Sequence, residues 1–228
     1  MRKRLVICGT QGAALVVADA VAAMGAYELV GFIGNSAGGS EDRADAMEIS
    51  CRPILGDDDR LQALAEEGKI DAVFVAIGEN HRRMTVTKRL QAALPDTIDF
   101  PSILHPSATV SGSAHCESAS LVLAGAVVGP GARIGAGCWV NTRASLDHHS
   151  EMMAYASLAP GVVTGGSVRI GEGSAICIGA VISHGVGIGE WSLVGAGATV
   201  VEDVPDHVVA FGVPARVVRA RCPDEGYL

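Results

Sequence analysis

The sequence predicts a small α/β domain over residues 1–100, followed by a parallel β-solenoid over residues 101–228. Strand-like and helix-like segments alternate in the first part, and a six-residue repeat runs through the second. Aromatic residues make up only 4% of the chain. This composition suits a narrow core filled by Val, Ile, Leu and Ala, because close-packed interiors leave no spare room for large rings.

The first part alternates short apolar runs with helical patterns. The expected order is strand 4–8, helix 11–24, strand 28–33, helix 57–67, strand 71–77, helix 80–93 and a last strand near 97–100. Asp57, Asp58 and Asp59 stand at the start of one helical pattern, where acidic groups complement the helix dipole. Alternation of this kind is typical of a parallel α/β unit.

The first strand and the first helix are joined by Gly9-Thr10-Gln11-Gly12-Ala13. Backbone N–H groups at a helix N-terminus can hold a phosphate. The full glycine spacing of dinucleotide-binding turns is absent. From the residues alone, this segment is therefore either a nucleotide site or a plain tight turn.

A double period runs through the second part. From Leu104 to Val200, every sixth residue is aliphatic or similar, and a small residue follows each of them four positions later. This pattern is typical of hexapeptide solenoids, in which three hexads close a triangular coil and residues eighteen apart stack. Glycine-rich stretches such as 129–131 and 171–173 supply turns. One prism leaves its outer faces partly apolar, so we expect copies of the chain to bury a face in a homotrimer.

Charge and composition exclude several classes of protein. The formal net charge of −8 argues against nucleic acids and anionic membranes as partners. No stretch approaches the roughly 18 apolar residues of a membrane span, and the apolar run after the basic N-terminus is too short for a signal peptide. We therefore expect a cytoplasmic protein. The six Cys show no CxxC pairing, which favours reduced, small apolar fillers and no metal site.

Four stretches carry a resemblance to known proteins: residues 9–13, His105-Pro106-Ser107-Ala108, Val140-Asn141-Thr142 with His148, and Gly212-Val213-Pro214-Ala215-Arg216. On these, the chain resembles the left-handed β-helix (hexapeptide-repeat) acyltransferases, and within them the nucleotide-sugar N-acetyltransferase and sialic acid O-acetyltransferase family. The resemblance implies a Rossmann-like α/β front domain, a left-handed parallel β-helix and acetyl-CoA as co-substrate. It also implies a UDP-, GDP- or dTDP-linked 4-amino-deoxysugar as acceptor, in polysaccharide biosynthesis.

The resemblance places a general base at His148, at a seam between subunits. An amine must lose a proton as it attacks the thioester, and imidazole titrates in the right range. Backbone N–H groups would stabilise the oxyanion. From the hexad register alone, His148 could equally be a polar turn residue. Relatives usually follow the base with Asp or Glu, whereas His149 follows here and Asp147 precedes.

We expect Asp147 and His149 to complete the catalytic group with His148, but the residue pattern does not say what orients the base. The orienting group is Asp147 with an altered backbone, a carboxylate of another coil, or a backbone carbonyl. Nine residues beyond the base, Ser157 stands where relatives have a second His. Its hydroxyl is expected near the acetyl group of the cofactor, where it would donate a weaker hydrogen bond than an imidazolium.

Further binding residues follow from the resemblance by position. Ile178 and Ala196 are expected to contact pantetheine through backbone groups, with ordinary turn residues as the alternative. In the front domain, a pair of Asp often ends the second strand of relatives, but Gly34-Asn35 stands here. The expected nucleotide-sugar ligands are Gly9, Gln11, Gly12, Ala13, Asn35 and Gly56.

Three alternatives stay open at this point. O-acetylation of a sugar or sialic acid would use the same base. A non-catalytic scaffold is suggested by the missing acidic partner and by Ser157. A solenoid carbonic anhydrase needs zinc-binding His, two of them typically five residues apart, and no His pair here has that spacing.

Overall fold

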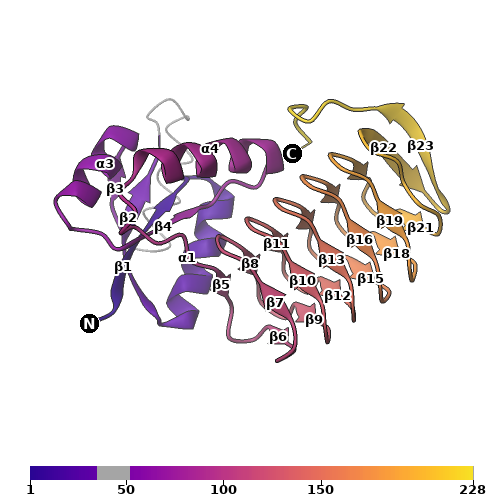
Figure 1. The fold of residues 1–228 in the computed structure, drawn as a ribbon, viewed down its shortest axis with the longest axis horizontal. Helices are drawn as coiled ribbons and strands as arrows, with labels where there is room; N and C mark the ends of the chain where they lie inside the picture. Colours follow the sequence, from indigo (N-terminus) through magenta and orange to yellow (C-terminus); the bar gives the residue numbers. More distant parts are fainter. Residues whose placement is uncertain (35–51, 228) are drawn as a thin grey trace. The chain divides into compact units, whose positions relative to one another are not determined.

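The computed structural model describes residues 1–34 and 52–227. It divides into two compact units, one formed by residues 1–78 and 82–103 and the other by residues 79–81 and 104–228 (Figure 1). Within the described ranges, no helix is both long and apolar enough to cross a membrane.

The first unit is a Rossmann-like parallel sheet with helices, as predicted. Its sheet has the strand order β3-β2-β1-β4. α1 packs against β1 and β2, whereas Leu61 and Leu64 of α3 and Leu90 of α4 share a core cluster with β1 and β4. The elements are β1 Lys3–Cys8, α1 Gly12–Met24, β2 Tyr27–Ile33, β3 Ile54–Gly56, α3 Asp58–Glu66, β4 Ala72–Val75 and α4 Asn80–Ala93.

Two local expectations for this unit were wrong. The strand expected near 97–100 is reduced to a single bridge between Ala72 and Asp99. Pro95 and Pro101 flank that segment, and proline cannot donate to a strand ladder. Conversely, β3 was not predicted, because its three residues are too few to show an alternating pattern. Asn35 lies outside the described residues.

The second unit is a left-handed parallel β-helix built from two-residue strands, which recur every six residues. These strands are β5 Ile103–Leu104, β6 Thr109–Val110, β7 His115–Cys116, β8 Leu121–Val122, β9 Val127–Val128, β10 Arg133–Ile134, β11 Trp139–Val140, β12 Ser145–Leu146, β13 Glu151–Met152, β14 Ser157–Leu158, β15 Val163–Thr164, β16 Arg169–Ile170, β17 Ala175–Ile176, β18 Val181–Ile182, β19 Gly187–Ile188, β20 Leu193–Val194 and β21 Thr199–Val200. An antiparallel pair, β22 Val208–Gly212 and β23 Ala215–Ala220, follows.

Residues eighteen apart pair across successive coils, as Trp139 does with Ser157. The strands form three sheets. We call the sheet from β5 to β23 the first, the sheet from β6 to β21 the second, and the sheet from β7 to β19 the third. The turns between them form three corners of the coil, named here by the two sheets that they join in chain order.

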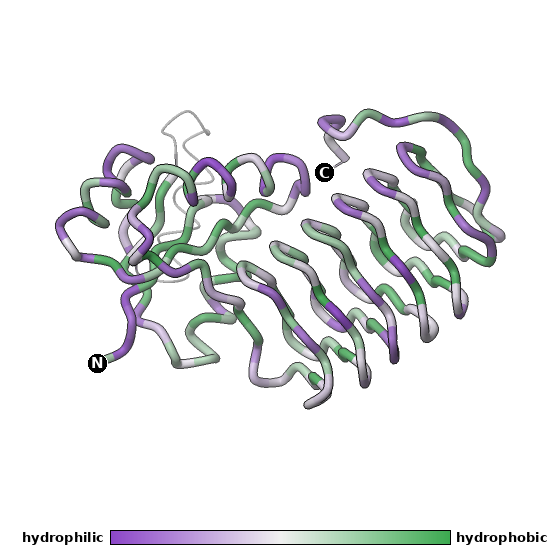
Figure 2. Tube along the Cα trace, viewed as in Figure 1, coloured by the Kyte–Doolittle hydropathy of each residue, from purple (hydrophilic) through white to green (hydrophobic). Residues whose placement is uncertain are grey.

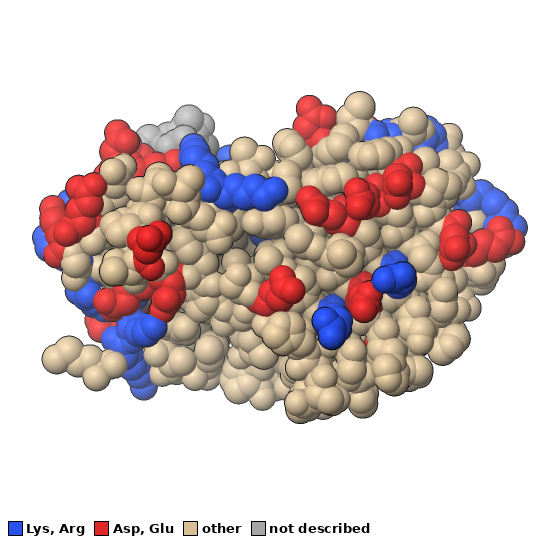
Figure 3. Space-filling model, viewed as in Figure 1, with Lys and Arg blue, Asp and Glu red and all other residues tan. Residues whose placement is uncertain are grey.

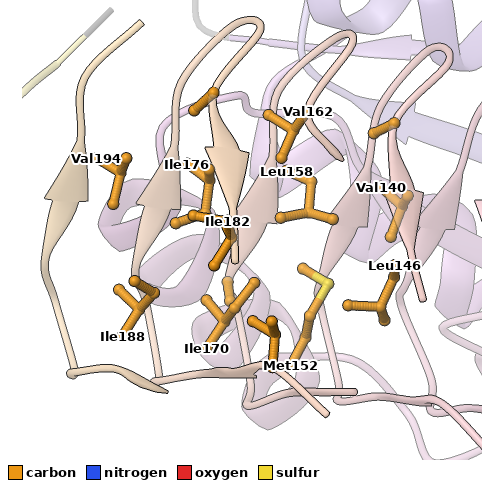
Figure 4. Packing of buried hydrophobic residues seen from close by; sticks show 14 of the residues in the cluster. Val140, Leu146, Met152, Leu158, Val162, Ile170, Ile176, Ile182, Ile188 and Val194 are labelled. Atoms are coloured by element: carbon orange, nitrogen blue, oxygen red, sulfur yellow. The ribbon is translucent and has the colours of Figure 1, made fainter. Parts of the chain in front are cut away.

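The repeat fills the inside of the coil as predicted. Inward residues such as Val140, Leu146 and Met152 are buried in one cluster (Figure 4), together with small residues such as Ala126 and Ala144. The narrow interior explains why the repeat admits no large ring.

The outer faces of the sheets differ in chemistry, and the trace changes between green and purple within each coil (Figure 2). On the second sheet, Val127, Val163 and Val181 point outward with 46%, 47% and 43% of their surface exposed. On the third sheet, Arg169 Nη2 lies 3.2 Å from Glu151 Oε2. Figure 3 shows blue and red residues interspersed over this face. The second sheet therefore presents the apolar surface of the coil, and the third a charged one.

Candidate active site

His148 lies in the turn of residues 147–150, at the second–third corner between β12 and β13. The next coil holds this turn from two sides: Asp147 N donates to Thr164 Oγ1 at 3.0 Å, and Ser167 N donates to the His148 carbonyl at 2.8 Å. Thr164 occupies an inward position that is otherwise aliphatic, and its hydroxyl serves as the acceptor. The backbone around His148 is thus fixed by hydrogen bonds to its neighbour coil.

The His148 ring lies over Gly166, the residue one coil later. A Cβ at position 166 would overlap the ring atoms Cε1 and Nε2 of His148. Because Gly166 has no side chain, the imidazole leans across it and approaches His184, two coils on, with ring centroids 5.9 Å apart. His148 is half-buried, whereas His184 is exposed.

His149 places a second imidazole beside the first. Its backbone is left-handed, with a φ of 55°. The Nδ1 atoms of His148 and His149 lie 3.1 Å apart, within hydrogen-bond distance. The Asp147 carboxylate accepts from the backbone N–H of His148 at 2.7 Å. The structure therefore brings the three expected residues together and pairs the ring of His148 with His149.

Ser157 lies elsewhere on the coil. It begins β14 in the first sheet and is buried, and its hydroxyl accepts from Asn80 Nδ2 at 3.0 Å. The same amide donates to the carbonyls of Gly173 and Ser174, both at 3.2 Å. Within one chain, Ser157 is thus engaged on a different side of the coil from His148.

Ile178 and Ala196 stack one coil apart at the first–second corner. Both are exposed, and the Ile178 carbonyl accepts from Gly197 N at 2.9 Å. This corner borders one side of the second sheet, and the His148 corner borders the other. The exposed apolar face therefore lies between the expected cofactor residues and the expected base.

In the first unit, glycines cluster at the carboxyl edge of the sheet. Gly9 N donates to Ile33 O at 2.8 Å, and Gly34 N donates to Gly56 O at 3.0 Å. Gly9 has a φ of 137°, and a Cβ there would lie 2.5 Å from the Ala76 carbonyl oxygen, so only glycine fits. Gln11 is the N-cap of α1, and its side chain makes no capping hydrogen bond. The first-turn N–H groups of α1, beginning at Gly12 and Ala13, thus lack a cap from Gln11.

A cavity of about 1140 Å³ lies at the opposite, amino edge of this sheet. Four of its charged lining residues form two ion pairs, Arg4 with Asp71 and Lys3 with Asp99. Among the residues that the structure describes, no group of three or more His, Cys, Asp or Glu is placed to hold a metal ion.

Sequence reasoning missed two residues of this geometry, Gly166 and His184, and it missed the contact of Asn80 with the coil. The spacing of eighteen links the first two to His148, so the coil period could have found them. No such spacing links Asn80 to the coil, because Asn80 lies 77 residues before its partner Ser157 in the sequence.

Comparisons with known proteins agree with this architecture. Residues 4–90 match the model of the PglD N-terminal domain. GDP-perosamine N-acetyltransferase from Caulobacter crescentus, solved as a histidine-to-alanine mutant with CoA and GDP-perosamine, is 32% identical with a TM-score of 0.85, over 94% of this chain and 96% of that one. The acetyltransferase domain of PglB from Neisseria gonorrhoeae, solved with acetyl coenzyme A, is 33% identical with a TM-score of 0.85, over 96% and 100%. The chain belongs to the nucleotide-sugar N-acetyltransferase family of left-handed β-helix acyltransferases.

Shorter stretches of the chain are also similar to other acetyltransferases. Galactoside O-acetyltransferase from Escherichia coli is 51% identical over 55 residues, which is 23% of this chain and 27% of that enzyme. The chain spans about a quarter of the length of this and the next curated relatives that it matches.

Proposed function

We propose that the protein transfers the acetyl group of acetyl-CoA to the amino group of a nucleotide-linked 4-amino-deoxysugar, with His148 as general base. One observation carries the proposal. A half-buried imidazole stands at a corner of the coil beside an exposed apolar sheet, in a chain that aligns over 94% of its length with an enzyme solved with CoA and GDP-perosamine.

The chemistry needs one base and no acyl-enzyme. The amine attacks the thioester carbonyl, its N–H bond breaks, and Nε2 of His148 takes the proton. The tetrahedral intermediate then expels the CoA thiolate, which is a good leaving group, and the proton passes from His148 to that thiolate or to solvent. Backbone N–H groups would stabilise the oxyanion.

We place this reaction in a homotrimer. Val127, Val163 and Val181 expose apolar surface on the second sheet, with Ser145 between the first two. Burial of this surface against copies of itself favours association. The two corners that border this sheet would then meet across a seam. The His148 corner of one chain would face Ile178 and Ala196 of its neighbour, where exposed backbone groups can accept pantetheine.

The first unit is the proposed site of the nucleotide. The uncapped N-terminus of α1 and the turn from Gly9 suit a diphosphate, because helix N-terminal N–H groups bind anions. Gln11, Gly12 and Ala13 would line it, and Gly56 ends the neighbouring strand β3. The location in the cytoplasm and the role in polysaccharide biosynthesis remain predictions of the sequence.

The test is an acetyl-CoA consumption assay with UDP-, GDP- and dTDP-linked amino sugars. Replacement of the base in His148→Ala should lower turnover by roughly 10²–10⁴-fold, the usual share of general-base catalysis. Binding of CoA, measured by calorimetry, should stay close to wild type. His148→Asn serves as a second variant that keeps a polar side chain. Turnover near wild type in both would remove His148 from the role, and no turnover of any amino sugar would remove the acceptor class.

O-acetylation is the second candidate, because the E. coli enzyme of similar repeat sequence is a galactoside O-acetyltransferase. An imidazole base can deprotonate a hydroxyl as it does an amine. The assay panel therefore includes CMP-sialic acid, free sialic acid and a galactoside. Faster transfer to any of these than to every amino sugar would replace the first proposal by the second.

A further inference from the structure

The expected base, His148, has a second imidazole as its direct neighbour in the sequence. His149 follows His148 directly, and the two Nδ1 atoms lie 3.1 Å apart with ring planes nearly perpendicular, at 81°. Resting on the proposed function, we propose that His149 is a positioning residue. Its neutral ring accepts the Nδ1–H of His148 and so holds the base in the tautomer whose Nε2 carries the lone pair.

When both rings are neutral, the hydrogen bond between the two Nδ1 atoms can have only two forms, with either His148 or His149 as the donor. In a neutral imidazole, one nitrogen donates and the other accepts. If His148 Nδ1 donates to His149 Nδ1, then Nε2 of His148 is free to take a proton from substrate. If His149 donates instead, Nε2 of His148 holds a hydrogen and cannot act as a base. Only the first form supports catalysis by Nε2.

The hydrogen bond from His148 Nδ1 to His149 also persists when Nε2 of His148 takes the proton. When the substrate N–H bond breaks, its proton forms a bond to His148 Nε2. His148 is then an imidazolium with two N–H groups, and its Nδ1–H still donates to the neutral His149. No proton has to leave His149, so the pair carries one positive charge during the step.

The backbone holds His149 in place for this role. Its N–H donates to the Pro130 carbonyl at 2.9 Å, its backbone is left-handed with a φ of 55°, and its ring lies over Gly131 of the preceding coil. The corresponding residues of other coils, Gly131, Ser167 and Gly185, share the positive φ but bear no ring. His149 therefore adds a hydrogen-bond acceptor to a turn that needs none for its fold.

Among the groups around His148, His149 is the one that forms a hydrogen bond with its ring. The Asp147 carboxylate takes the backbone N–H of His148. His184 faces the ring from two coils on, at a centroid distance of 5.9 Å and a tilt of 51°, and no hydrogen bond joins them. Gly166, which lies under the ring, has no side chain. A neutral acceptor gives the imidazolium less stabilisation than a carboxylate would.

Two variants separate positioning from folding. His149→Gly removes the acceptor and keeps the left-handed backbone, as Gly131 and Gly185 do in their coils. His149→Asp supplies a charged acceptor, and Asp tolerates this backbone. Ser167→Gly is the matched control, because it makes the same kind of change at the same corner one coil later.

We expect His149→Gly to lower kcat by about 10–100-fold, as loss of an orienting partner does, with the KM for acetyl-CoA within about twofold of wild type. His149→Asp should keep kcat within about threefold, and the acidic limb of its kcat/KM profile should move to higher pH, because a carboxylate stabilises the imidazolium. Ser167→Gly should match wild type in both. If His149→Gly keeps the wild-type rate and pH profile while His148→Ala is inactive, the positioning role is wrong and the proposed function stands.

A second readout does not depend on activity. Long-range ¹H–¹⁵N spectra of histidine-labelled protein at pH 8 report the tautomer of each ring. We expect His148 as the Nδ1–H form in wild type and as the Nε2–H form in His149→Gly. An Nε2–H form of His148 in wild type overturns the proposal whatever the enzyme does. If no acceptor is acetylated, the proposed function fails, and these spectra alone decide the role of His149.

Discussion

Two corners of the coil stack a ring on a glycine, yet the rings differ in exposure. At the third–first corner, Tyr155 lies over Gly137 and Trp191 over Gly173. Both rings are almost covered, with 6% and 9% of their surface exposed. At the second–third corner, His148 lies over Gly166 of the following coil, and His149 lies over Gly131 of the preceding coil. His148 is only half-buried, and His149 is exposed.

The difference separates packing from chemistry. Trp191 contacts His81 edge to face at 5.6 Å, and its carbonyl accepts from Arg221 Nη1 at 3.0 Å. A ring held on several sides serves the fold. The imidazole of His148 is only half-buried, and its Nδ1 contacts His149, which leaves Nε2 for a substrate in the proposed function. A ring beside a glycine thus has a structural use at one corner and, in the proposed function, a catalytic use at the other.

The largest expected effect is on stability at the covered corner. In Gly173→Ala, the new Cβ would overlap the Trp191 ring, and alanine would have to adopt a φ of 65°. Overpacking and a left-handed backbone each cost about 1–2 kcal/mol or more. We therefore expect a loss of about 3 kcal/mol in urea denaturation. Gly179→Ala is the control: its φ of 66° is almost the same, but no heavy atom lies near the new Cβ. Equal losses in the two variants would show that the ring contact adds nothing.

At the open corner, the matching substitution should affect activity instead. Gly166 does not have a positive φ, so alanine fits its backbone. The new Cβ would overlap the half-buried ring of His148 and displace it from its contact with His149. We expect kcat to fall by about 10²-fold, or about 2.7 kcal/mol in the barrier, with a loss of stability below about 1 kcal/mol. Steady-state kinetics and urea denaturation of the same sample measure both. A stability loss equal to that of Gly173→Ala would erase the contrast between the corners.

Replacement of either of two buried serines, one at each corner, should lower stability by a similar amount. At both corners the serine hydroxyl accepts a hydrogen bond from a backbone N–H of the next coil. Ser174 Oγ accepts from Ser192 N at 2.8 Å, and Ser150 Oγ accepts from Val168 N at 3.0 Å. Ser174→Ala or Ser150→Ala leaves a buried N–H without its partner, which costs about 1–3 kcal/mol. We expect about 2 kcal/mol for each in urea denaturation. A cost much larger at Ser174 would mean that the covered corner depends on more than its ring.

The sequence predicted the parts of this comparison that repeat. The six-residue period located the coil, its inward residues and the turn of His148, because each coil obeys the same steric rule. The exposure of a ring does not repeat, since it depends on what covers the corner. The partners of Ser157 were equally hidden, because Asn80 bonds it across a separation of 77 residues. In the first unit, the three residues of β3 were too few to show a pattern, whereas the long apolar stretch of α1 was clear.

A partly exposed ion pair in the first unit tests the same link between exposure and stability. Its loss should have the smallest effect of these substitutions. Arg4 Nη2 donates to Asp71 Oδ1 at 2.8 Å, and 37% and 36% of the two side chains are exposed. The hydrogen bonds from the Arg4 side chain and backbone lower the pKa of Asp71 from 3.8 to about 2. A lowered carboxyl pKa stabilises the fold above the unfolded value, and this contribution is lost as the pH falls from about 4 to about 2.

Solvent screens such a pair, so its contribution is small. At pH 7, Asp71→Asn should lower the Tm by at most about 2 °C. The difference from wild type should shrink as the pH falls below 4 and be mostly lost near pH 2, where about half of the wild-type carboxyl groups are protonated. Calorimetry at pH 7, 4 and 3 follows this change. A large loss of Tm at pH 7 would show that partial exposure does not weaken a contact in this fold. Exposure could then not explain the difference between the two corners.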